Sequence, residues 1–227
     1  GLYESKGGCL ADDSAEDGPS ACQTPTERAR LNALIERLRA IDPVKYAARI
    51  EEAEEDLVKL KTIEKAIRKV YASLWTERAF LSRDYYRLDH MQVYMGILVH
   101  PAFIDEAANG VVVVTAKDGT LEMDVVVQTQ DISITNPDIP GARPDRFTMV
   151  RAANGSTGAP AYSLKNNQMP NGAPVLSDAQ IASLAKQLPI VFETMKTEYA
   201  NTFGGRIDVE IMVDATGAVI MKQARPL

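Results

Sequence analysis

The sequence has few of the residues that carry covalent, redox or transition-metal chemistry. Its 227 residues include two cysteines, two histidines and one tryptophan. The cysteines form no CxxC pair and no cluster with histidine, so nothing in the sequence supports a zinc site. No nucleophile or metal motif surrounds His90 or His100, and we expect both side chains to be structural.

Excess positive charge and long apolar runs are also missing. Lysine and arginine number 25 against 31 aspartates and glutamates, which gives a net charge of −6 and a pI of about 5.1. This balance argues against a general nucleic-acid surface. No apolar run is long enough to span a bilayer, and no signal peptide is recognisable. With 45% hydrophobic residues, the chain can bury one sizeable core or two small ones.

The two cysteines leave the cellular compartment open. Cys9 and Cys22 flank an acidic loop rich in glycine, serine and aspartate. A disulfide across this loop would indicate an extracytoplasmic protein, whereas two unpaired thiols would carry no such implication. The sequence favours neither interpretation.

The hydrophobic pattern predicts an α+β fold, with helices first, then antiparallel strands, a long helix and a hairpin. Predicted helices cover residues 25–40, 43–82 and 178–199. Predicted strands cover residues 92–99, 110–115, 121–129, 147–151 and 162–164. Ser177 and Gln180 have the spacing of a capping box for the last helix, and Pro189 should kink that helix.

The strongest candidate site lies at the C-terminal end, in residues 206–227. Apolar and polar residues alternate on both sides of a turn at 214–217, which predicts a β-hairpin. If the turn closes symmetrically, Asp208 lies opposite Gln223. One face would then carry Asp208, Glu210, Gln223 and Arg225. The other face would carry Ile207, Val209, Ile211, Val213 and Ile220.

The polar face of this hairpin suits a hard cation and a polyphosphate. Carboxylate and amide oxygens hold Mg²⁺, which usually keeps waters and bridges to phosphate oxygens. Arginine clamps phosphate. The alternative is a solvated hairpin with an incidental salt bridge, because any half-buried hairpin alternates in this way.

Several motifs, in order, resemble the nucleotide-binding domain of the phosphoenolpyruvate synthase and pyruvate phosphate dikinase family. The ending DVEI…KQARPL at 208–227 resembles the family's D-I-E-W…Q-x-R-P hairpin. VYASLWTERAF at 70–80 resembles V-x-A-S-L-W-x-x-R-A. MGILVHPAF at 95–103, with NGV at 109–111, resembles M-x-x-x-V-x-x-M…x-G-V. VVVQTQD at 125–131 resembles the strand that carries the family's G-E, and GLYES at 1–5 resembles the residues after its R-S-S segment.

The resemblance implies an ATP-grasp fold, with the whole chain as a partial nucleotide-binding domain. Residues 25–60 have no counterpart in the family pattern, so we expect them to form a helical-hairpin insertion. The implied cofactors are ATP and Mg²⁺. Glu210 and Gln223 would bind the metal and the phosphates with Asp208 beside them, and Arg225 would contact phosphate oxygens as the catalytic residue. The backbone around Val99 and His100 would meet adenine, and Asp131 would stand where the family has glutamate.

Two departures from the family pattern bear on activity. Gln130 and Asp131 replace the family's Gly-Glu, and the lysine and arginine that bind phosphate from the N-terminal lobe are absent. The implied partners are that lobe and a phosphohistidine domain that accepts the phosphoryl group. By resemblance the protein is cytoplasmic, and this chain alone should be inactive. The alternative function is a non-catalytic ATP-grasp-like module for protein interaction or structure.

Overall fold

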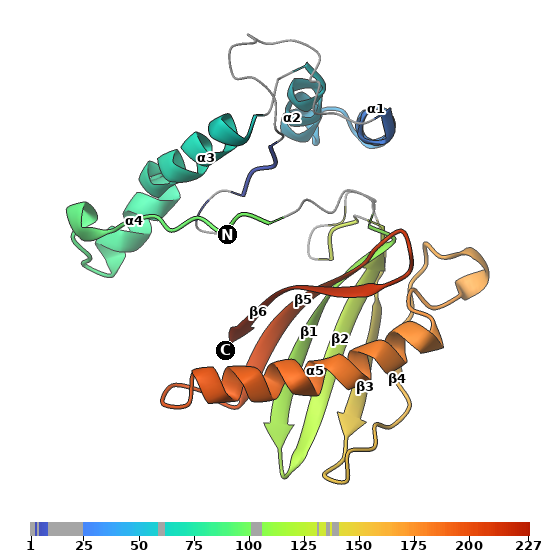
Figure 1. Cartoon of the computed structure of the whole chain (residues 1–227). Coiled ribbons are helices and arrows are strands. Elements are labelled where there is room, and N and C mark those ends of the chain that lie inside the picture. The colour runs from blue at the N-terminus through green and yellow to red at the C-terminus, as the bar shows by residue number, and fades with distance from the viewer. Residues whose placement is uncertain are drawn as a thin grey trace. The chain divides into compact units, whose positions relative to one another are not determined.

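The computed structural model of the chain is shown in Figure 1. The structure describes residues 3, 5–8, 25–58, 62–100, 106–130, 132–134, 137 and 141–227. The chain divides into two compact units, residues 1–102 and residues 103–227. Cys9, Cys22 and Asp131 lie outside the described residues.

The first unit is helical in its described part. Its α-helices are α1 (Pro25–Ile41), α2 (Ala47–Val58), α3 (Ile63–Ala72) and α4 (Glu77–Tyr85), with short 3₁₀ turns η1 (Ser73–Trp75) and η2 (His90–Gln92). Helices α1 and α2 pack together through Ile35, Leu38, Ile50 and Ala53. Each helix supplies two residues three apart, the spacing that places side chains on one helical face.

The helical pattern predicted over 43–82, with a kink as one option, is confirmed in type but is divided into α2, α3, η1 and the start of α4. Thr62 has an extended backbone, and its hydroxyl accepts a hydrogen bond from the backbone N–H of Lys65, which begins α3 as a new helix. Thr76 is also extended, and α4 begins after it. Helical periodicity continues across these breaks, so the hydrophobic pattern alone did not reveal them.

The strand predicted over 92–99 is wrong. Residues 93–100 have no regular secondary structure, and Tyr94 and Leu98 are 87% and 86% exposed. A strand needs a neighbour to pair with its backbone groups. None of the described residues in this unit forms a strand ladder, so residues 92–99 have no described strand in the unit with which to pair.

The second unit is a six-stranded antiparallel sheet with one long helix across it (Figure 1). Its strands are β1 (Ala108–Lys117), β2 (Thr120–Thr129), β3 (Asp145–Arg151), β4 (Ala161–Leu164), β5 (Arg206–Val213) and β6 (Val219–Pro226). Their order in the sheet is β4-β3-β2-β1-β5-β6. Helix α5 (Asp178–Glu198) precedes β5, and a 3₁₀ turn, η3 (Pro170–Gly172), precedes α5. The predicted α+β class is confirmed.

Helix α5 covers one face of the sheet and builds the core of this unit. Leu184, Leu188 and Phe192 of α5 pack against alternate strand residues such as Val112 and Val209. The predicted capping box is present, since Ser177 accepts from the backbone of Gln180 and the Gln180 side chain accepts from the backbone of Ser177. The helix continues through a buried Pro189. Side chains of opposite parity along each strand form the other face, called here the open face.

Candidate functional site

The C-terminal hairpin forms from β5 and β6, but its register differs from the expected one. Asp208 pairs with Arg225, and Glu210 pairs with Gln223. After Glu210 the register shifts by one, so that Ile211 pairs with Met221 and Lys222 is the extra residue of a β-bulge. The prediction that Asp208 lies opposite Gln223 is therefore wrong, because it assumed an unbroken ladder and a symmetric turn.

The bulge changes which apolar residues face the core. Met221 packs on the core beneath α5, whereas Ile220 pairs with Met212 and so lies on the open face. The expected placement of Ile220 with Ile207 and Val209 is wrong. Residues that oppose each other in a ladder point to the same side. The register therefore brings the four polar residues together on the open face, as the alternation predicts: Asp208, Glu210, Gln223 and Arg225.

Asp208 and Arg225 form a fixed ion pair within this polar face. The Nε–H and Nη2–H groups of Arg225 donate to Oδ2 of Asp208 at 2.9 and 2.6 Å. The Asp208 residue is 8% exposed, whereas the Arg225 side chain is 58% exposed. The carboxylate is therefore committed to orienting the guanidinium, whose other N–H groups stay accessible. With this geometry Asp208 holds the guanidinium in place, and the accessible N–H groups of Arg225 are of a kind that can bind an anion.

Glu210 and Gln223 carry side-chain oxygen atoms that are available to a ligand. Glu210 is half-buried and Gln223 is exposed. In the part of the chain that the structure describes, neither side chain has a hydrogen bond or an ion pair. Directly opposed residues have Cβ atoms about 4.5–5.5 Å apart. A carboxylate oxygen and an amide oxygen can thus converge on one small cation.

The middle of the open face is apolar beside this polar cluster. Val111 of β1 pairs with Glu210 on one side and with Val126 of β2 on the other. Val113 lies between Asp208 and Asp124 in the same way, and all three valines are half-buried. The strip ends in a polar contact, where the Thr148 hydroxyl donates to Oδ1 of Asp124 at 2.7 Å. A ligand on this face would meet an apolar floor with polar groups at its edge.

The remaining predicted residues belong to segments of the chain outside the hairpin. Val99 is 67% exposed and lies with His100 in the first unit. Asp131 lies outside the described residues, but its neighbour Gln130 is well fixed. The backbone N–H of Gln130 donates to the carbonyl of Ala107 at 2.8 Å, and the Asn109 amide donates to the carbonyl of Gln130 at 2.6 Å. The loop after β2 thus begins against the start of β1.

Lys222 and Glu106 belong to the hairpin region but were not singled out from the sequence. The ammonium of Lys222, at the bulge, lies 2.7 Å from Oε1 of Glu106, and Glu106 is 11% exposed. The two residues are far apart in the chain, and no local motif links them. Among the described residues no three histidine, cysteine or acidic side chains are arranged to hold a metal ion. A cation at Glu210 and Gln223 would therefore rely on water and ligand oxygens for the rest of its coordination.

Asp214 holds the turn that connects β5 and β6. Its Oδ1 accepts from the Thr216 hydroxyl at 2.7 Å and from the backbone N–H groups of Thr216 and Ala218, both at 2.9 Å. The side-chain hydrogen bond from Thr216, followed by the backbone bond from Ala218, lowers the pKa of Asp214 below its ordinary value of 3.8. These bonds close residues 214–218 as a loop in place of the expected even turn.

We expect Asp214→Ala to lower the melting temperature at neutral pH. A depressed pKa means that the stabilisation is present above the ordinary value and disappears as pH falls through the folded-state pKa. The difference between the wild-type chain and the variant should therefore narrow as the pH falls below 3.8, the ordinary pKa of the carboxyl. Thr216→Val, which removes the first of these bonds, should show a smaller loss with the same sign. Calorimetry across this pH range checks both, and a constant difference would refute the linkage.

The fold and this face define an α+β domain with an oxygen-rich polar cluster, an exposed arginine and an apolar floor on one sheet. Residues 52–227 match the family model described as pyruvate phosphate dikinase, AMP/ATP-binding domain. The chain belongs to this family. The comparison with curated proteins returned no match. The matched range begins inside α2 and includes the entire sheet unit. Within the described residues, no helix is both long and apolar enough to cross a membrane.

Proposed function

We propose that the chain forms part of an ATP-grasp phosphotransferase domain and holds ATP with Mg²⁺ on the open face of its sheet. The observation that carries this proposal is the arrangement at the hairpin. Glu210 and Gln223 oppose each other with no other partner among the described residues, next to an Arg225 that Asp208 fixes. Membership in a family of AMP/ATP-binding domains supports a nucleotide as the ligand.

Each residue of the hairpin has a proposed role. The Glu210 carboxylate and the Gln223 amide oxygen would hold Mg²⁺, which supplies charge neutralisation to the phosphates when it is bound. Arg225 would bind phosphate oxygens and stabilise charge during transfer, through the N–H groups that Asp208 leaves accessible. Val111 and Val126 would support an apolar part of the nucleotide. The resemblance adds the backbone around Val99 and His100 at adenine, and Asp131 near the ribose.

The phosphoryl group would go to a histidine on another domain of a longer protein. Phosphoryl transfer depends on positioning and charge neutralisation, so a complete site needs cationic groups on both sides of the phosphates. This chain supplies the acidic, metal-holding side and one arginine. An N-terminal lobe would supply the opposing lysine and arginine. Residues 25–60 would be an insertion into this partial domain, and the chain alone should not turn over.

Nuclear magnetic resonance of the ¹⁵N-labelled chain tests the proposal even if binding is weak. Addition of ATP with Mg²⁺ should shift the Gln223 side-chain amide, the Arg225 Nε–H and backbone amides of β1 and β5. Glu210→Ala should remove most of these shifts because the metal loses its carboxylate. Glu122→Ala is the matched control. Glu122 lies on β2 and faces the same side of the sheet, and the substitution removes the same charge as Glu210→Ala.

The control variant separates a metal site from general electrostatics. Glu122→Ala should leave the shifts in place. An equal loss in both variants would mean that only net charge matters at this face. Absence of shifts in the unmodified chain would favour the non-catalytic module and reject nucleotide binding at the hairpin.

A further inference from the structure

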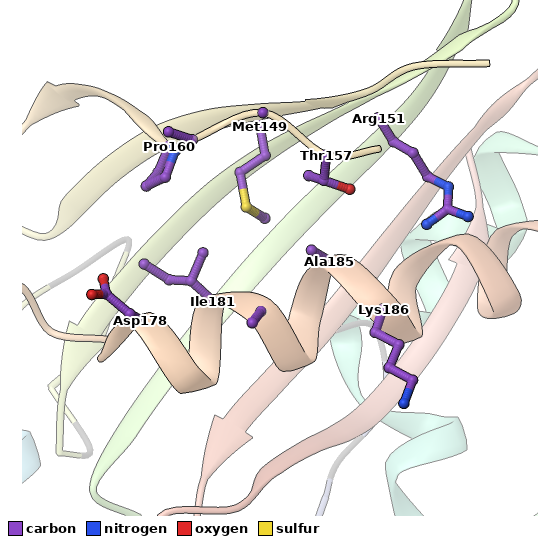
Figure 2. Close-up of a pocket in the computed structure, with 11 residues that line it drawn as sticks. Met149, Arg151, Thr157, Pro160, Asp178, Ile181, Ala185 and Lys186 are labelled. Carbon is purple, nitrogen blue, oxygen red and sulfur yellow. The ribbon is translucent and has the colours of Figure 1, made fainter. Parts of the chain in front are cut away.

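A groove on the helix side of the sheet has no role in the proposed function. It lies between α5 and the segment that joins β3 to β4, with a cavity volume of about 430 Å³. Figure 2 shows the residues that line it from both sides. Its apolar wall includes Met149 of β3, Pro160 of the joining segment, and Ile181 and Ala185 of α5. The volume is within the range of small-molecule sites, about 300–1,000 Å³.

Two cationic residues line one end of the groove. Arg151 closes β3, and Lys186 lies on α5; both also line an adjoining pocket along α5. In the described part of the chain, neither side chain has an ion-pair partner. Asp178 lies at the opposite end of the same groove (Figure 2). The groove therefore has a positive end, an apolar middle and a negative end.

The rim beside Arg151 is fixed by backbone hydrogen bonds. The N–H of Ala152 donates to the carbonyl of Ser156 at 2.8 Å, and the N–H of Gly158 donates to the carbonyl of Val150 at 2.9 Å. Gly155 has a φ of +85°, which a tight turn there requires. A bound molecule would meet a largely preformed wall, so little ordering would oppose binding.

We propose that this groove binds a small amphipathic monoanion, with its charged head between Arg151 and Lys186 and its apolar body against Met149, Ile181 and Ala185. Charge complementarity fixes the direction, because a carboxylate or sulfonate at the other end would meet Asp178. The same carboxylate disfavours ligands with negative charge at both ends. An apolar middle favours a hydrocarbon or aromatic body over a sugar.

This site is independent of the nucleotide site. Met149 and Ile181 belong to the core side of the sheet, which α5 covers, whereas Glu210 and Gln223 lie on the open face. A nucleotide at the hairpin therefore does not compete directly for the groove. The proposal stands or falls separately from the proposed phosphotransferase function.

The test is a fluorescence titration of the 227-residue chain with anilinonaphthalene sulfonate, an amphipathic monoanion. The dye should bind saturably, and octanoate should displace it, whereas inorganic phosphate and ATP with Mg²⁺ should not. Arg151→Ala and Lys186→Ala should each weaken dye binding about tenfold, because each removes a charge-assisted contact. Ala182→Trp adds bulk at an exposed position of the groove wall and should block binding while both cations remain.

Arg146→Ala is the matched control, since Arg146 is an exposed arginine of the same strand on the opposite face of the sheet. It should leave the dye affinity unchanged, and calorimetry should show that all four variants are folded. The proposal is overturned if phosphate displaces the dye as well as octanoate does. It is also overturned if Arg146→Ala weakens binding as much as Arg151→Ala, or if Ala182→Trp binds normally.

Discussion

ATP with Mg²⁺ should bind to this chain alone about a hundred to ten thousand times more weakly than to a domain that adds a lysine and an arginine across the phosphates. Each missing charge-assisted hydrogen bond costs about 1.5–3 kcal/mol, and a tenfold loss in affinity corresponds to about 1.4 kcal/mol. On the polar face of the hairpin, this chain offers the phosphates Arg225, which Asp208 holds in place. The acidic wall would repel ATP phosphates unless a metal ion screens them.

Titration calorimetry with ATP and Mg²⁺ measures this affinity directly. The chain alone should give weak binding that disappears when the metal is removed with a chelator. A form of the protein extended by a lobe that supplies such a lysine and arginine should bind ATP with a much lower dissociation constant. Micromolar binding by the 227-residue chain, lost in Glu210→Ala, would show that the site is complete here and that no opposing lobe is needed.

Leu188→Ala should cost about 2–5 kcal/mol of the free energy of unfolding of the sheet unit. Leu188 is fully buried and lies in the α5 face that packs on the sheet. Its truncation removes apolar contacts and leaves a cavity that a close-packed interior fills poorly. Because α5 is the helix that builds this core, the melting temperature of the unit should fall by roughly 10 °C or more.

Ile190→Ala is the matched control for this prediction. Ile190 lies two residues further along α5 and is 64% exposed, so its truncation should change stability by no more than about 0.5 kcal/mol. Scanning calorimetry can follow the sheet unit, whereas tryptophan fluorescence cannot, since Trp75 lies in the first unit. Equal losses in the two variants would mean that α5 does not pack on the sheet as described.

Local sequence signals predicted the elements whose determinants are themselves local. The two-residue turn between β1 and β2 has positive φ at Asp118 and Gly119, the combination that the sequence Asp-Gly indicates. The capping box at Ser177 located the start of α5 within one residue. Alternation identified both strands of the terminal hairpin. In each case, neighbouring residues decide the backbone conformation.

Features that depend on distant partners were not predictable in this way. The alternation at 92–99 resembles that of a strand, but pairing depends on a neighbour that the pattern cannot supply. The bulge at Lys222 depends on the pairing of β6 with β5, which the sequence of β6 alone does not determine. The symmetric ladder assumed no bulge, and it therefore gave the wrong partner for Asp208. Resemblance and alternation predicted Glu210, Gln223 and Arg225 as one cluster, and the register places them on the same face. The groove at Arg151 and Lys186 joins a strand end to a distant helix, and no local motif marks it.

The bulge at Lys222 also affects how the terminal hairpin can tolerate changes in chain length. Met221 and Gln223 both keep their partners, Ile211 and Glu210, across this extra residue. Loss of Lys222 would leave a regular ladder with those pairs intact, at the cost of its contact with Glu106. Loss of a residue within the paired segment 223–226 would instead shift the strand by one residue. Side chains before the gap would then turn to the opposite face of the sheet, or the pairs across the ladder would change. Relatives whose hairpin is one residue shorter, but which keep the oxygen-rich face, should therefore lack the residue that corresponds to Lys222.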